Sequence, residues 1–182
     1  DNMVTGLPAL LKILSQSKPK LLVLPVFKRY NQGIFTMSGY LQRHTPHKNP
    51  LLAFLKFPFS LLFCNYIGPP SALIVSQSLH YEFDPGFKWH VDIVAYIGLL
   101  FQVNRADLYV VPSDCLSVVS DQTFMASITA TIKSNLPAIK RAEWHCISNR
   151  YPAINLFDRA IGSLAYVYVK FLAILSFDRL KA

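Results

Sequence analysis

The segment from Phe87 to Asp114 most constrains the fold that this chain can adopt. It reads FKWHVDIVAYIGLLFQVNRADLYVVPSD, and apolar side chains occupy every second position after its tryptophan: Val91, Ile93, Ala95, Ile97, Leu99, Phe101 and Val103. Side chains on a β-strand alternate between two faces, so this spacing predicts a long strand that ends at Val103. A polar break follows, and the run 106–111, which ends at Pro112, predicts a second, short strand. The middle of the chain is therefore predicted to belong to a sheet rather than to a catalytic loop.

Other segments repeat the strand pattern. Phe124–Ile132 alternates most cleanly, 140–147 alternates again, and a last long strand is expected over about 163–177, where β-branched and aromatic residues are frequent. Leu21–Tyr30 reads as a first strand whose Pro25 suits an edge or a bulge, and a further strand is expected over 72–79. With about eight strands, no strong helix and no βαβ rhythm, the sequence predicts an all-β, eight-stranded antiparallel sandwich or barrel.

The domain organisation is predicted to be simple. At 182 residues, with 52% hydrophobic residues, the chain is long enough for one domain with a substantial core and too apolar for general disorder. Residues 1–20 are expected to form an N-terminal arm, with about two helical turns over 7–14, and residues 21–182 a single domain. The segment 51–64 is compatible with either a strand or a short helix, and turns are expected at 68–70 and 84–86.

The positive charge is concentrated in the first part of the chain. Residues 1–81 hold eight Lys and Arg against one acid, which gives +7, whereas residues 82–182 hold ten basic and nine acidic residues, which gives +1. Basic segments of this kind commonly contact polyanions such as RNA or an anionic membrane surface. The alternative is a basic face that is simply solvated.

Cysteine usage and hydropathy indicate neither a disulfide framework nor a membrane protein. Cys64, Cys115 and Cys146 are widely spaced and odd in number, which favours reduced thiols acting as small apolar side chains. The apolar run 51–63 is too short to cross a bilayer, and 160–177 carries Lys170 near its centre. No signal peptide is recognisable, and we expect no membrane span.

No catalytic or cofactor motif is present. His44 and His47 are three residues apart without a further ligand nearby, and the neighbours His145 and Cys146 would point to opposite faces of a strand. Asp92, Asp107 and Asp114 could act as acid–base partners, but capping and turn roles explain Asp107 and Asp114 without catalysis. We therefore expect no enzyme activity, no metal, no cofactor and no small-molecule substrate.

The aromatic residues allow two interpretations. Two tryptophans and four tyrosines could form a stacking platform for single-stranded nucleic acid: Trp89, Trp144, Tyr96, Tyr109, Tyr166 and Tyr168. The favoured interpretation of the same residues is that they are core and interface aromatics of a sandwich. The sequence leaves both interpretations open.

The order of features over residues 80–177 resembles the jelly-roll coat proteins of picorna-like viruses. The resemblance rests on the tryptophan-led strand after Phe87-Lys88-Trp89, on the strand ending Val110-Val111-Pro112, and on two later segments, WHCISNRYP at 144–152 and Gly162-Ser163-Leu164. The separate small coat proteins of plant-infecting secoviruses, notably the cheravirus-like members, are similar in size. The resemblance implies an eight-stranded antiparallel jelly roll with an extended basic N-terminal arm. Proteolytic release from a precursor would then explain a chain that begins at Asp1.

The resemblance also implies a function. It predicts a capsid protein that assembles in the host cytoplasm with copies of itself and sister coat proteins into an icosahedral virion around single-stranded RNA, which it contacts without sequence preference. Four basic residues are predicted to face that RNA: Lys18, Lys20, Lys28 and Arg29. The alternative is a basic, non-catalytic subunit of a large organellar or ribonucleoprotein complex, which the composition fits nearly as well.

Overall fold

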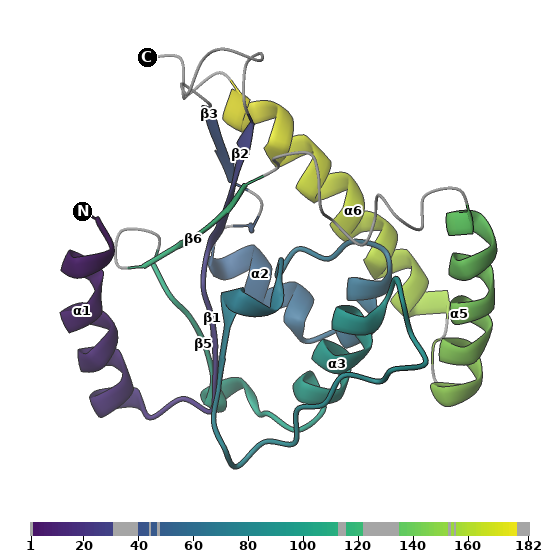
Figure 1. Cartoon of the computed structure of the whole chain (residues 1–182), viewed down its shortest axis with the longest axis horizontal. Helices are drawn as coiled ribbons and strands as arrows, with labels where there is room; N and C mark the ends of the chain where they lie inside the picture. Colours follow the sequence, from purple (N-terminus) through teal and green to yellow (C-terminus); the bar gives the residue numbers. More distant parts are fainter. Residues whose placement is uncertain are drawn as a thin grey trace.

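The fold is a mixed α/β structure and not the predicted all-β jelly roll. The computed structural model describes residues 2–30, 40–43, 45–46, 48–112, 116–121, 135–152, 154 and 156–177. Six short strands in these ranges form two three-stranded sheets, and long helices surround them (Figure 1). The prediction of an eight-stranded antiparallel sandwich is therefore wrong.

The first sheet has the order β4-β1-β5, and its centre is β1 (Leu21–Val23). β4 (Leu73–Val75) pairs with β1 antiparallel, whereas β5 (Leu108–Val110) pairs with it parallel. A parallel neighbour requires a long crossover, and the chain between the strands supplies it with helices. The prediction of purely antiparallel pairing fails at this strand.

The second sheet continues the first after a break at Pro25. Its order is β3-β2-β6, with β2 (Val26–Tyr30) between β3 (Tyr40–Arg43) and the parallel strand β6 (Val118–Asp121). Proline has no backbone N–H, so Pro25 cannot donate a hydrogen bond to a neighbouring strand. The N–H of the next residue, Val26, donates to the buried Thr45 hydroxyl at 2.8 Å. Residues 21–30 thus run through both sheets as one interrupted ribbon.

Helices cover both sides of the first sheet. α1 (Asn2–Ser17) lies on one side, while α2 (Lys48–Leu55) and α3 (Val91–Leu100) lie on the other, followed outward by α6 (Leu156–Phe177) and α5 (Leu136–Arg150) (Figure 1). Short 3₁₀ turns connect them: η1 (Pro58–Leu62), η2 (Pro70–Ala72) and η3 (Arg105–Asp107).

The alternation of side chains on β1 separates two apolar clusters. Leu21 and Val23 belong to the larger cluster, which also contains most of α3. Leu22 points the other way and packs with Leu10 of α1 and with Val111. All five side chains are less than 7% exposed, so the strand is buried on both faces. Such burial removes apolar surface from water on both sides and is the main stabilising contribution to this sheet.

The predicted strand ending at Val103 is instead the helix α3. Both odd- and even-numbered residues are buried along α3. They include Val94, Tyr96 and Leu100, which a strand would have placed on its second face. When nearly every position of a short apolar run is buried, its periodicity cannot distinguish a helix from a strand. Tertiary burial here outweighs the β-preference of valine and isoleucine.

The strands predicted over 140–147 and 163–177 are also helices. In α5 the buried residues are Glu143 and Ile147, four positions apart, and the alternation of Ala142, Trp144 and Cys146 was coincidental. In α6, Gly162 and Ala165 are buried one turn apart. Pro137 occupies the first turn of α5, where a backbone N–H would have no partner within the helix.

Several local predictions are confirmed. The first strand with its proline interruption, the strand within 72–79 and the short strand within 106–111 are present, as are turns at 68–70 and 84–86. The two helical turns expected over 7–14 lie within α1, which makes residues 2–17 helical; Leu10 packs against the first sheet, so the segment is not an extended arm. The strand predicted at Phe124–Ile132 lies outside the described residues.

The sequence analysis predicted no membrane span. None of the helices in the described ranges combines the length and the hydropathy that crossing a bilayer requires.

Candidate functional site

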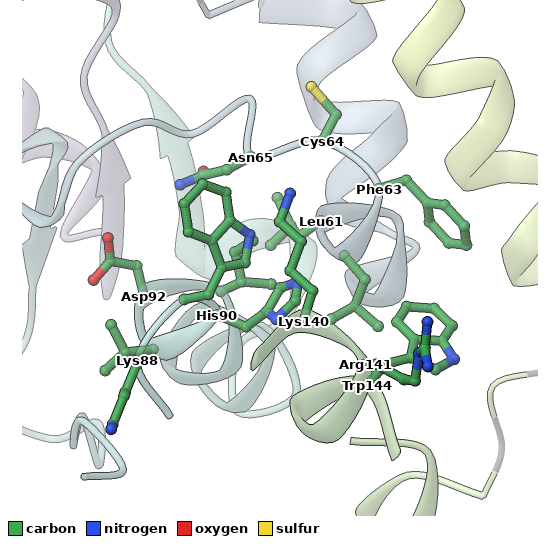
Figure 2. Close-up of a pocket in the computed structure, with 14 residues that line it drawn as sticks. Leu61, Phe63, Cys64, Asn65, Lys88, His90, Asp92, Lys140, Arg141 and Trp144 are labelled. Atoms are coloured by element: carbon green, nitrogen blue, oxygen red, sulfur yellow. The ribbon is translucent and has the colours of Figure 1, made fainter. Parts of the chain in front are cut away.

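A cleft in the described part of the chain lies where α5 meets the start of α3. Its volume is about 720 Å³, and three segments that are distant in sequence line it: residues 61–65, residues 88–93 and residues 140–144 (Figure 2). Volumes of this size are typical of ligand sites. The cleft is therefore the first place to look for function.

A buried carboxylate, Glu143, joins two of these segments. Its oxygens accept backbone N–H bonds from Lys88, from Trp89 at 2.9 Å and from His90 at 2.9 Å. The His90 ring contributes a further contact from Nδ1, also at 2.9 Å. These amides precede α3, where the helix dipole is positive, so a negative charge is well placed there. Glu143 therefore fixes α5 to the N-terminus of α3.

The electrostatics of this pair favour an ionised Glu143. Burial raises the pKa of this carboxyl, but the N–H bonds from residues 88–90 and the His90 ring outweigh it and hold the pKa below its ordinary value. Burial lowers the pKa of His90, and the contact with Glu143 only partly opposes this effect. Because Glu143 already occupies the amides at the start of α3, an incoming anion has to bind elsewhere in the cleft.

A second contact attaches the same loop two turns further along α5. Arg150 Nη2 donates to Asp84 Oδ2 at 2.6 Å, and the Gly86 N–H donates to the other oxygen of that carboxylate at 2.8 Å. Together the Gly86 N–H and Arg150 lower the pKa of Asp84. The loop 84–90 is thus held to α5 at both ends, which fixes one wall of the cleft relative to the other.

Three cations surround the opening of the cleft. Lys88 comes from the loop before α3, and Lys140 and Arg141 come from the second turn of α5; all three are exposed. In Figure 2 the Lys140 side chain crosses the middle of the cleft, with Arg141 on one side and Lys88 on the other. Asp92 is the one acid among the lining residues, so the lining carries a net positive charge.

Both tryptophans of the chain line this cleft. The Lys140 ammonium lies 4.3 Å from the Trp89 ring centroid, in the range of a cation–π contact. The Trp144 ring packs edge-on against Phe63, with centroids 5.9 Å apart and planes at 72°. Two residues of the predicted stacking platform are therefore brought together, although they are far apart in sequence.

The four tyrosines of that platform lie elsewhere. Tyr96 is completely buried in α3 and donates to the Gly68 carbonyl at 3.1 Å, and Tyr109 lies on β5. Tyr166 is an exposed residue of α6, and Tyr168 of the same helix packs against Phe54. None of them lines the cleft. For these four tyrosines, core and surface packing is the better description.

The four predicted RNA-facing residues lie along the ribbon of β1 and β2 rather than at the cleft. Lys18 and Lys20 are exposed just before β1, and the Lys20 ammonium is 3.3 Å from the Asp107 carboxylate. Lys28 and Arg29 occupy neighbouring positions on β2. Their contact with RNA remains a prediction.

Other residues considered from sequence divide into two groups. Asp107 closes a capping box with Asn104 at η3, His145 and Cys146 are exposed on α5, and burial raises the pKa of Asp92. His44, His47, Asp114 and Cys115 lie outside the described residues. Within the described ranges, no group of three His, Cys, Asp or Glu side chains could hold a metal ion.

Sequence reasoning named the two tryptophans of the cleft but missed its charged residues. Lys140, Arg141, Glu143 and Trp144 form one five-residue stretch, KRAEW, but a strand interpretation distributes them over two faces. On a helix they follow one another around a little more than one turn. A helical interpretation, starting from Pro137 as a first-turn residue, was the available signal.

Three comparisons with known proteins were made. No protein-family model, no curated protein and no solved structure matches this chain. The function is therefore inferred from the residues that line the cleft.

Proposed function

We propose that this chain is a non-catalytic subunit that binds single-stranded RNA through the cleft between α3 and α5. The observation that carries the proposal is the convergence of Lys88, Lys140 and Arg141 with both tryptophans on one cleft. Proteins that bind single strands combine a basic groove for the phosphates with aromatic rings for the bases. This cleft offers both groups within one site.

The charge of the whole chain supports the same proposal. The net charge is +8, and further exposed lysines lie in the N-terminal part, at 12, 18 and 20. Basic residues release counterions from the phosphate backbone, which contributes affinity without sequence preference.

A role as one subunit of an assembly is supported by α6. Its outer face exposes Leu164, Val167 and Phe171, each by more than half. Contiguous exposed apolar side chains commonly mark contacts with other proteins. Both hypotheses drawn from the sequence, a coat protein and a ribonucleoprotein subunit, include such contacts. The coat-protein hypothesis was drawn from a jelly-roll resemblance that the fold contradicts, so we favour the ribonucleoprotein subunit.

The test is the affinity of the purified chain for a fluorescent 12-nucleotide single-stranded RNA, measured by anisotropy at several salt concentrations. Each phosphate contact on a single strand contributes about −0.7 to the slope of log affinity against log salt. Lys88→Gln, Lys140→Gln and Arg141→Gln are each expected to reduce the slope by about that amount and to weaken binding.

The matched controls are Lys56→Gln and Arg105→Gln. Both residues are exposed, and both line a different, smaller cleft of about 330 Å³. These variants remove the same charge and are expected to change the slope less than the three cleft variants do. If all five variants reduce the affinity equally, the cleft is not the binding site.

A further inference from the structure

The two tryptophans of the cleft are held in different ways, and the difference indicates which one is available to a ligand. Trp89 is contacted on its ring face by the Lys140 ammonium, 4.3 Å from the centroid. Lys140 is an exposed side chain at the opening of the cleft. One group that covers the Trp89 ring is therefore the end of an exposed, flexible side chain.

Trp144 is used in packing. Its ring meets Phe63 edge-on at 5.9 Å, and Figure 2 shows the two side chains together on one wall of the cleft. Phe63 also lies where a Cβ on Gly162 of α6 would stand, so this wall is closely packed. Movement of Trp144 would disturb that packing, whereas Lys140 can leave Trp89 by rotating its own side chain.

We propose that Trp89 is the base-stacking residue of the cleft, and that Lys140 leaves the indole face to bind phosphate when a base takes its place. The inference rests on the proposed function and names the ligand unit: one nucleotide with an unpaired base. An ammonium interacts more strongly with a phosphate than with an aromatic ring. A nucleotide therefore offers its phosphate to Lys140 and its base to the Trp89 ring that Lys140 uncovers.

The neighbouring polar groups favour stacking over recognition of the base edge. The Asn65 amide is already engaged at both ends, because it donates to the Gly68 carbonyl and accepts the Gly68 N–H, each at 3.0 Å. Half of its hydrogen-bonding capacity is therefore already used, and its orientation is fixed toward Gly68. Stacking tolerates every base, so we expect weak sequence preference.

The test compares the affinity of the chain for two 12-nucleotide strands. One is oligoadenylate, and the other is a ribose-phosphate strand of the same length that has no bases. The wild-type chain is expected to bind oligoadenylate about tenfold more tightly or better, because one base is stacked. Trp89→Leu should reduce the affinity for oligoadenylate to the abasic level and leave the abasic affinity unchanged. Trp89→Phe, which keeps a ring, should retain part of the preference.

A second measurement leaves Trp89 in place. In Trp144→Phe, Trp89 is the single tryptophan, and its fluorescence should be quenched by oligoadenylate but not by the abasic strand. Quenching by both strands, or by neither while oligoadenylate binds, would overturn the stacking inference. This readout applies even if Trp89→Leu fails to fold.

The outcomes separate the two proposals. If the wild-type chain binds neither strand, the proposed function fails and the stacking inference with it. If it binds both strands equally and Trp89→Leu does the same, RNA binding stands and stacking on Trp89 is wrong. If adenosine monophosphate competes as well as the 12-residue strand, the cleft is a nucleotide pocket, and the assignment to single strands is overturned.

Discussion

Glu143 is the single residue on which the geometry of the cleft depends most. It is 5% exposed, and its carboxylate is the common acceptor for three consecutive backbone N–H groups and one histidine ring. A carboxylate can satisfy all of these donors only when it is ionised. The position of α5 relative to α3 is therefore coupled to one negative charge.

Replacing Glu143 by Gln should be strongly destabilising at neutral pH. The amide has nearly the same shape, but its NH₂ group would face backbone donors that then lack an acceptor. Leaving a buried group unpaired costs about 1–3 kcal/mol, and more where a charge was involved, so we expect a loss of about 2–4 kcal/mol. Urea unfolding at pH 7, followed by circular dichroism, measures this loss. Glu82→Gln, at an exposed residue, is the control and should change stability little.

The effect of Glu143 should also depend on pH. Its folded-state pKa lies below the ordinary 4.5, so the ionised form stabilises the fold. That contribution is fully present above about pH 4.5 and is lost as the pH falls through the lower, folded-state pKa. The difference in unfolding free energy between wild type and Glu143→Gln should therefore shrink below pH 4.5. A difference that stays constant down to pH 3 would show that the charge is not responsible.

At the scale of elements, the strands that were predicted correctly from the sequence are those that contain or adjoin a proline. Pro25 interrupts the first strand, Pro70 precedes the strand at 73–75, and Pro112 follows the strand at 108–110. Proline acts through local geometry, which does not depend on the rest of the fold.

The helices were mispredicted for a different physical reason. The segments of α3 and α6 are rich in valine, isoleucine and tyrosine, so their intrinsic preference is for strands. What makes them helical is their packing, which the sequence of the segment does not contain. The cleft was hidden for the same reason, since its residues meet only if 136–150 is a helix that packs beside 88–93.

A substitution at Gly162 would test how closely α6 packs against Phe63. Gly162 is buried, and a Cβ at this position would overlap the Phe63 ring, so Gly162→Ala should destabilise the fold by about 1–3 kcal/mol despite the higher helix propensity of alanine. Thermal unfolding measures the loss. Ser163→Ala, at an exposed neighbour, should change stability by less than about 0.5 kcal/mol. A stabilising effect of Gly162→Ala would mean that α6 does not pack closely against Phe63.

At the scale of the whole molecule, two groups of cations could be contacted together by one long strand of RNA. One group surrounds the cleft, and the other follows the ribbon of β1 and β2. From Lys20 to Lys28 an extended chain covers about 26 Å, at about 3.3 Å per residue. A short oligonucleotide in the cleft would not extend along the whole ribbon.

Replacing Lys18, Lys20, Lys28 and Arg29 together by Gln should therefore weaken binding of a 30-nucleotide RNA and reduce its salt dependence, with little effect on a 6-nucleotide RNA. Anisotropy with both lengths measures this. Triple replacement of Lys56, Arg105 and Arg159 by Gln, compared per charge removed, is the control. An unchanged affinity for the long RNA would exclude the ribbon as an RNA-facing surface.

The parallel pairing of the central ribbon also determines when the molecule can fold. β1 and β2 are made well before their parallel partners, β5 and β6, with Leu21 opposite Leu108 and Val26 opposite Val118. A nascent chain that ends before residue 108 can complete only the antiparallel ladders with β3 and β4, and it leaves one edge of the ribbon unpaired. Pairings between such distant residues close large loops and are slow to form. The ribbon at the centre of the native structure is therefore among its last parts to be completed, and until then its open edge can pair with other chains.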